Sequence, residues 1–236
     1  MRKIILTSDI DWAPEEVIQD FLDLLQSFKA KCTLFCTHQS QVISNSDSKL
    51  FEKAIHPNFN PSLMEGVPIG AEETLNKILS IYPDAVGIRS HSMTSSTPLQ
   101  FLFNEKGLKY DSNLFLPYKW NVKPFKSWTG LTTIPYHWED DIHFSYGKNF
   151  EKIPFEKNSE FELMIFDFHP IHVFLNTDCE QTYLNAKKDY HDYNKLKTHV
   201  NNSRVGTRDF LIKLLKSCSS SNDTSFFLMK DLILND

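Results

Sequence analysis

The stretch Lys-Ile-Ile-Leu-Thr-Ser-Asp-Ile-Asp at residues 3–11 decides the fold class. Its short apolar run predicts a buried strand that ends at Asp9 and Asp11. A helix is expected next, because Pro14 precedes two acidic residues, as is typical of a first helical turn, and apolar residues then recur at helical spacing. Residues 32–37 (CTLFCT) predict a second strand. This β-α-β order places the two carboxylates at the carboxyl end of a strand, where active sites of parallel α/β folds and barrels collect.

Three later strands are expected to end in polar residues of a similar kind. These strands cover residues 51–55, 85–88 and 163–168, and the residues that follow them are His56, then Arg89-Ser90-His91, then His169. Four strand ends that each carry such a side chain are what a closed or partly closed (β/α) barrel would give. The rest of the chain adds helices and short strands. We expect helices over 71–82, 97–106, 178–197 and 206–217, strands over 108–113 and 226–229, a loop over 219–222, and irregular strands and loops over 114–160.

The composition restricts the class of function. The chain has 236 residues, 41% of them hydrophobic and 23% charged, which suits one α/β domain over residues 1–236. A net charge of −5 without a basic cluster argues against nucleic-acid binding. No segment has the length of apolar sequence needed to span a bilayer, and no signal peptide is recognisable, so we expect a cytoplasmic protein whose four cysteines are free thiols.

Each candidate segment also has an ordinary structural interpretation. Asp9 and Asp11 could supply a metal ligand and a general base, or they could form a solvated turn that caps the next helix. His56, in an Asn/Pro-rich turn, and His91, beside Arg89, could be metal ligands or ordinary loop residues. His169 follows a strongly apolar strand and has the side chain most often used to protonate a leaving group.

Other signals are weaker. The acidic segment Trp138-Glu139-Asp140-Asp141 with His143 could line the same cleft or form a surface loop, and Cys32 and Cys36 are expected to pack in the core. The aromatic residues Trp120, Trp128, Tyr136 and Trp138 could stack on a sugar, although core positions are more common for them. His137, His191 and His199 have no evident partners, and neither a phosphate-binding loop nor a Gly-x-Ser-x-Gly nucleophile motif is present.

Taken in order, these motifs resemble the polysaccharide deacetylases of the NodB-homology superfamily, carbohydrate esterase family 4. The segments Ile55–Pro61, Arg89–Ser92 and Phe168–Thr177 look most similar to the WbmS-like branch, and the resemblance covers about residues 3–180. It implies a distorted (β/α) barrel of about seven strands. In two places the sequence departs from the usual family pattern: Ile10 separates the two acids, and no second histidine lies three or four residues from His56, so that His91 would be recruited from another strand end.

The resemblance also implies roles for individual residues. Asp9 would be the general base, Arg89 would keep it ionised and oriented, and His169 would be the general acid. A divalent cation, zinc or alternatively cobalt, manganese or nickel, would be held by Asp11, His56 and His91.

From these implied roles we expect the protein to remove an acyl group from a sugar or glycan intermediate in surface-polysaccharide biosynthesis. The expected acyl group is N-acetyl. The partner would be a carbohydrate or a sugar nucleotide. Two alternatives stay open at this stage: a catalytically degenerate domain that binds glycan, and a metal-dependent amidohydrolase or phosphoesterase that acts on another small molecule.

Overall fold

The computed structural model describes residues 2–11, 13–61, 70–152 and 161–234. Its strands are β1 (Arg2–Asp9), β2 (Cys32–Cys36), β3 (Phe51–Ile55), β4 (Gly87–Ile88), β5 (Tyr110–Asp111), β6 (Phe125–Lys126), β7 (Thr132–Thr133), β8 (Trp138–Glu139), β9 (Leu163–Asp167) and β10 (Thr224–Phe227). Its helices are α1 (Glu15–Ser27), α2 (Gln41–Asn45), α4 (Ala71–Ile81), α5 (Thr97–Glu105), α6 (Asp140–Ser145), α7 (Pro170–Leu175), α8 (Glu180–Lys187), α9 (Tyr193–Leu196) and α10 (Thr207–Ser219), with 3-10 turns η1 (His91–Met93), η2 (Lys197–His199) and η3 (Met229–Leu232).

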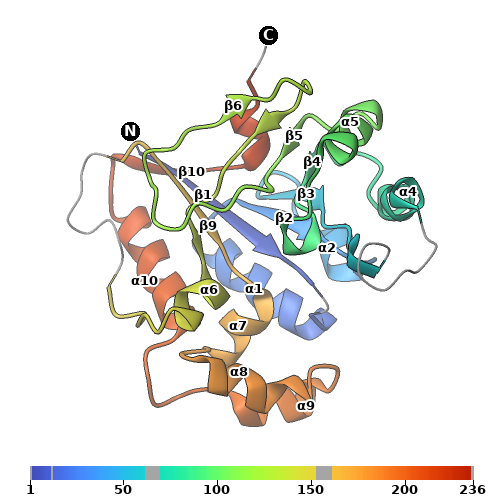
Figure 1. Cartoon of the computed structure of the whole chain (residues 1–236). Coiled ribbons are helices and arrows are strands. Elements are labelled where there is room, and N and C mark those ends of the chain that lie inside the picture. The colour runs from blue at the N-terminus through green and yellow to red at the C-terminus, as the bar shows by residue number, and fades with distance from the viewer. Residues whose placement is uncertain (1, 12, 62–69, 153–160, 235–236) are drawn as a thin grey trace.

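The strands form one curled sheet in the order β6-β7-β5-β4-β3-β2-β1-β9-β8, with β10 added beside β1 (Figure 1). All pairings are parallel except that of β6 with β7. An isolated parallel bridge joins Phe115, which follows β5, to Tyr136, which precedes β8, and so connects the two sides of the curled sheet. The expected distorted barrel is therefore confirmed.

The sheet has more strands than the expected seven or so, because the described residues contribute ten. The difference arises in the segment expected to be irregular, where β6, β7 and β8 are only two residues long each. Strands this short carry no measurable alternation of apolar and polar residues. Residues 153–160 of that segment lie outside the described residues.

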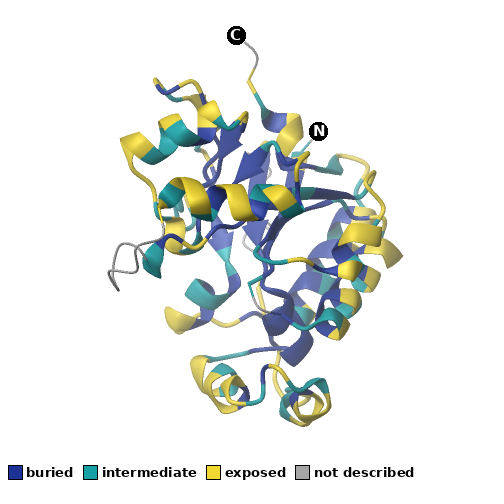
Figure 2. Ribbon diagram, turned by 90° about the vertical axis from the view of Figure 1, so that its right-hand side faces the viewer, coloured by how far each residue is buried: buried dark blue, intermediate teal, exposed yellow. Residues whose placement is uncertain are grey.

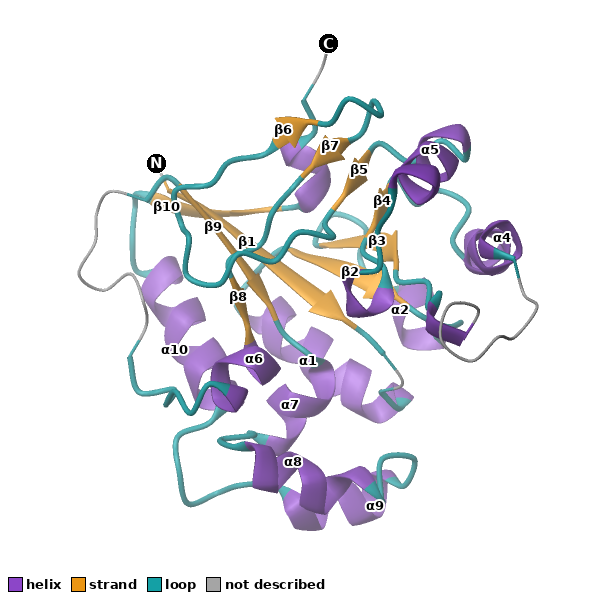
Figure 3. Ribbon diagram, in the orientation of Figure 1, coloured by secondary structure: helices purple, strands orange, loops and turns teal. Residues whose placement is uncertain are grey.

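The central strand β1 uses both of its edges. One edge pairs with β9 over residues 3–7, while the other pairs with β10 over residues 2–5 and then with β2 over residues 6–9. Strands from the beginning, middle and end of the described chain thus meet at the centre of the sheet. Figure 3 shows β8 and β9 running toward the end of the molecule where α6 and α7 lie.

The core has two parts, one on each face of the sheet. Helices α1, α7 and α10 cover the outer face with a large apolar cluster that includes Cys32 and Cys36, as expected for these thiols. A smaller cluster fills the inside of the curled sheet and includes Met229 and Leu232 of η3. Figure 2 shows the buried strands between helices whose outward faces are exposed.

The predicted helices are confirmed, except that one of them is divided into two. The helix expected over residues 178–197 is α8 and α9, separated by the segment 188–192. Short helices α2, α6 and α7 follow strand ends and were not expected, because they have too few turns to show a helical repeat. Among the described residues, no helix is both long and apolar enough to cross a bilayer.

Candidate active site

The alternation of side chains along the strands builds a polar layer inside the barrel. On β1, Ile5 belongs to the inner apolar cluster, so Thr7 and Asp9, two and four residues further, face the same way. On β9, Ile165 belongs to that cluster, and Asp167 follows it on the same face. The inner face therefore changes from apolar to polar toward the carboxyl ends of the strands.

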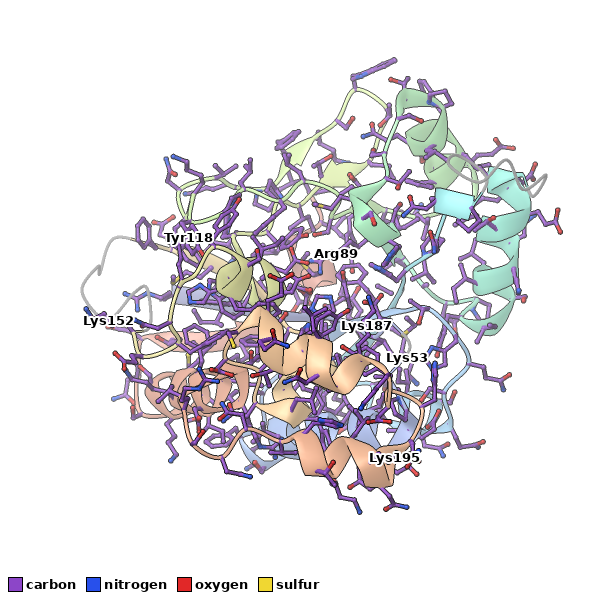
Figure 4. The ribbon with its side chains drawn as sticks, turned by 60° about the horizontal axis from the view of Figure 1, so that its bottom comes forward. Lys53, Arg89, Tyr118, Lys152, Lys187 and Lys195 are labelled. Atoms are coloured by element: carbon purple, nitrogen blue, oxygen red, sulfur yellow. The ribbon has the colours of Figure 1, made fainter. Side chains whose placement is uncertain are left out.

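Arg89, which follows β4, occupies the centre of this polar layer. Its side chain is 1% exposed, and its Nη1 donates to Asp9 Oδ1 at 2.8 Å and to Asp167 Oδ1. The guanidinium also lies between the rings of Phe35 and Tyr136, at 4.2 and 4.0 Å from their centroids. Its other N–H groups donate to Thr7 Oγ1, to Ser112 Oγ and to the Ser112 carbonyl. Figure 4 shows Arg89 surrounded by other side chains, whereas the labelled Lys152 lies at the periphery.

This pairing determines the charge on Arg89 and Asp9. Burial alone would lower the pKa of Arg89, but the Asp167 and Asp9 carboxylates raise it well above its ordinary value. Burial raises the pKa of Asp9, and Arg89 opposes that rise. Asp9 is therefore a carboxylate held by a permanent cation but more basic than an exposed aspartate, which suits a proton acceptor.

Asp11, His56 and His91 converge beside Asp9. The His56 Nε2 and His91 Nδ1 atoms lie 3.6 and 3.4 Å from Asp11 Oδ1, and they are 3.3 Å from each other. Asp11 Oδ1 is buried and has no hydrogen-bond partner of acceptable geometry among the described residues, and the same is true of His56 Nδ1. Three such ligand atoms around one point form a group that could hold a metal ion.

Neighbouring loops fix the backbone of these three residues. Asp11 has a left-handed conformation, with φ of 45°, and its carbonyl oxygen accepts hydrogen bonds from Thr37 and His38, which follow β2. The amide of His56 donates to Cys36, and the amide of His91 donates to the carbonyl of Pro57. The candidate ligands are thus held by main-chain contacts between adjacent strand ends.

The protonation of the two imidazoles differs. Burial lowers the pKa of His56 to about 3, which keeps this ring neutral at physiological pH. The Asp11 carboxylate raises the pKa of His91. The imidazoles of His91, His169 and His56 in turn hold the pKa of Asp11 well below its usual range despite burial. A neutral histidine and an ionised aspartate are the forms that bind metals.

His169 stands on the opposite side of Asp11 and is fixed by Asp140. His169 Nδ1 donates to Asp140 Oδ1 at 2.7 Å, and the His169 amide donates to Asp140 Oδ2 at 2.9 Å. Its other nitrogen, Nε2, lies 3.7 Å from Asp11 Oδ2. Burial alone would lower the pKa of His169, but Asp140 raises it well above the ordinary value. His169 therefore favours its protonated form, and its Nε2 faces the candidate metal ligands.

Two other clusters of potential ligands fit a metal less well. In the cluster of Asp140, His169 and His172, the aspartate and one histidine already share a hydrogen bond. In the cluster of Asp9, Glu139, Asp167 and His169, the Arg89 guanidinium already compensates two of the carboxylates.

Two cavities meet at the candidate metal ligands. One, of about 400 Å³, contains both Asp9 and His169 and has walls from α6, α7, α8 and the segment before α9. The second, of about 760 Å³, extends past β2, β3 and α4. Both are lined by Asp11, Ala13, His56 and His91. We call the first the catalytic cleft and the second the outer cavity.

The structure thus brings together all six residues expected from the sequence: Asp9, Asp11, His56, Arg89, His91 and His169. The weaker aromatic and histidine candidates do not line the catalytic cleft. Trp120, Tyr136 and Trp138 are buried in the core, while Trp128 is 77% exposed, and none of them lines either cavity. His143 and His137 are buried and hydrogen-bonded to backbone carbonyls, His199 pairs with Asp189, and His191 lines the outer cavity.

Some residues of the candidate site were not identified from the sequence. Asp140 belongs to an acidic segment for which a cleft and a surface loop were equally good expectations, and only its burial against His169 distinguishes them. Asp167 pairs with Arg89, and its alternate position with Ile165 on the strand is the signal that it faces inward. Tyr190, which lines the catalytic cleft, lies in a polar segment without any recognisable pattern.

A family model and a solved structure show the family of this chain. A family model described as WbmS-like polysaccharide deacetylase matches residues 6–187. A protein of Bordetella bronchiseptica, assigned as a polysaccharide deacetylase involved in O-antigen biosynthesis, has a similar structure with a TM-score of 0.82 and 34% identity, covering 91% of this chain and 90% of that chain. The search of curated proteins gave no match.

More distant structures share the fold. A polysaccharide deacetylase structure from Mycobacterium smegmatis has a TM-score of 0.58 at 14% identity, covering 98% of this chain and 88% of that chain. A peptidoglycan N-acetylglucosamine deacetylase has a TM-score of 0.52 at 12% identity, covering 99% of this chain and 89% of that chain.

Proposed function

Because the chain belongs to the WbmS-like polysaccharide deacetylase family, we propose that it is a metal-dependent hydrolase that removes an N-acetyl group from a sugar. Its substrate would be a glycan intermediate or a sugar nucleotide used in surface-polysaccharide biosynthesis, the process to which the Bordetella protein is assigned. The observation that carries the proposal is the arrangement in the catalytic cleft. A carboxylate base held by Arg89 and a histidine acid held by Asp140 lie on either side of Asp11 and its two imidazoles.

The residues present fit a divalent cation. Asp11 Oδ1 is a buried anionic oxygen without a hydrogen-bond partner of acceptable geometry, which is costly unless a cation compensates it. One carboxylate and two imidazoles are a ligand set typical of catalytic zinc, and cobalt, manganese or nickel are alternatives. When bound, the cation would supply Lewis-acid activation of the acyl carbonyl and of water.

The protein side chains would then move two protons. Asp9 accepts the proton of the attacking water, and Arg89 keeps Asp9 ionised and oriented before that transfer. His169 gives its Nε2 proton to the departing amine, and Asp140 stabilises the imidazolium before the transfer. Asp9 lies beside a cation and His169 beside a carboxylate, and these opposite environments assign Asp9 as the base and His169 as the acid. The products are acetate and a free amino sugar.

The two cavities support a substrate larger than one monosaccharide. The candidate ligands lie at their junction, so a sugar held in the catalytic cleft could continue into the outer cavity. Lys77, His38 and His191 line the outer cavity and offer polar and cationic groups to the remainder of the substrate. This arrangement suits either a further sugar or the phosphates of a nucleotide sugar.

The test is acetate release by the purified protein, with and without added zinc, from a panel of N-acetylated oligosaccharides and sugar nucleotides. We expect acetate release that a chelator abolishes and that zinc or cobalt restores. Phosphate release should be measured in parallel, because phosphate without acetate would identify a phosphoesterase instead.

The metal content of the purified protein distinguishes the proposed enzyme from the remaining alternative, a degenerate glycan-binding domain. A protein that holds no stoichiometric metal and releases no acetate would be a degenerate glycan-binding domain, and the proposal would be wrong. Asp9→Asn is the matched control, because it keeps the candidate ligands and removes the base.

A further inference from the structure

Tyr190 presents a buried hydroxyl group with no hydrogen-bond partner of acceptable geometry. The residue lies in the segment between α8 and α9, is 4% exposed and lines the catalytic cleft with Asp11 and His169. Its Oη is buried, and none of the described residues forms a well-aligned hydrogen bond with it. The segment that supplies it also lies beyond residues 6–187, the part matched by the family model.

The ring of Tyr190 is well packed, so the missing bond is confined to the hydroxyl. The ring lies 5.6 Å from that of Tyr183, which in turn lies 5.0 Å from that of His172, and all three residues line the cleft. Phenylalanine would fill the same space without burying an unpaired polar group. A hydroxyl kept at the expense of stability indicates a use in function, as do other strained or unsatisfied groups in active sites.

The neighbours of the hydroxyl indicate what it can do. Burial, followed by the nearby Tyr183 and Asp11, raises the pKa of Tyr190, so the phenol keeps its proton and can donate. The Asp11 side of the cleft is where the candidate cation would hold the acyl group under the proposed function. An acceptor oxygen placed there would meet a donor whose contact with Tyr183 lacks the geometry of a full hydrogen bond.

We propose that the Tyr190 hydroxyl donates a hydrogen bond to the acyl oxygen of the substrate and stabilises the negative charge that develops on it. This inference rests on the proposed function for the identity of the acyl group. Tyr190 would thus be a further catalytic residue, supplied by the α8–α9 segment.

The experiment compares Tyr190→Phe with the wild type in the zinc-loaded protein. We expect kcat for acetate release to fall roughly tenfold to a hundredfold, less than for a lone oxyanion-hole donor because the cation shares the charge, while KM changes little. The melting temperature should stay the same or rise, because the variant removes an unpaired buried group. Tyr110→Phe is the matched control: its buried hydroxyl donates to Glu52 at 2.9 Å outside both cavities, so the melting temperature should fall while kcat and KM stay near wild type.

A third measurement does not depend on turnover. Acetate, used as a probe of the acyl group, should bind roughly tenfold more weakly to Tyr190→Phe than to the wild type in calorimetry. If the wild type releases no acetate from any substrate, the proposed function fails, and the acetate and melting measurements still decide the role of Tyr190. The inference is overturned if Tyr190→Phe binds acetate as tightly as the wild type, or if it melts at a lower temperature as Tyr110→Phe does.

Discussion

The carboxylate of Asp140 should control the pH dependence of the enzyme through His169. In Asp140→Asn the shape of the side chain stays, but the charge 2.7 Å from His169 Nδ1 disappears. Burial then dominates the imidazole and lowers its pKa, whereas in the wild type Asp140 raises it. Because the acid must be protonated to act, activity would be lost at a lower pH in the variant than in the wild type.

The size of the effect follows from the contact. A charge pair about 4 Å apart in an effective dielectric constant of about 20 contributes about 4 kcal/mol, or about three pKa units. Asparagine keeps an oxygen that can still accept from His169 Nδ1, so we expect a smaller decrease of about one to two units. On the alkaline side of the profile, this decrease lowers kcat about tenfold to a hundredfold.

The assay is kcat for acetate release as a function of pH, together with an NMR titration of the His169 ring. Asp140→Asn also places an amide N–H group against a backbone donor, so its stability should be measured by urea unfolding, with an expected loss of about 1–3 kcal/mol. Asp141→Asn is the control, because Asp141 has the same charge but no hydrogen bond to His169 among the described contacts. The explanation is refuted if Asp140→Asn is folded and its alkaline limb coincides with that of the wild type.

Three further predictions concern the metal ligands and the buried arginine. Asp11→Asn should lose bound zinc, measured by elemental analysis, whereas retention of one equivalent would remove Asp11 from the ligand set. Asp9→Asn should keep its zinc but lose about a thousandfold or more in kcat, because the proton acceptor is gone; full activity would exclude Asp9 as the base. Arg89→Met should lower the free energy of unfolding by about 3–5 kcal/mol, because it leaves the buried Asp9 and Asp167 carboxylates uncompensated; urea unfolding near the wild-type midpoint would contradict this.

The site could be predicted from the sequence where a strand delivers the residue. Asp9, His56 and His169 each follow a recognisable apolar strand, and parallel strands bring their carboxyl ends to one edge of the sheet. The order of strands along the chain was therefore enough to predict that these side chains meet.

The residues that the sequence did not identify come from segments with no repeat. Asp140 begins a helix of only six residues, and Tyr190 lies between two short helices. Nothing in either segment distinguishes a buried polar side chain from an exposed one, because burial there depends on contacts with distant parts of the chain. Two-residue strands such as β8 were beyond prediction for the same reason.

The position of β1 has a consequence for how the protein is made. Residues 2–5 pair with residues 224–227, so the ladder on one edge of the central strand stays incomplete until residues 224–227 have left the ribosome. The growing chain must carry an apolar strand with an unpaired edge during synthesis, a state prone to aggregation. Slow folding after release, a need for chaperones during overexpression and poor tolerance of deletions that remove β10 are the expected results.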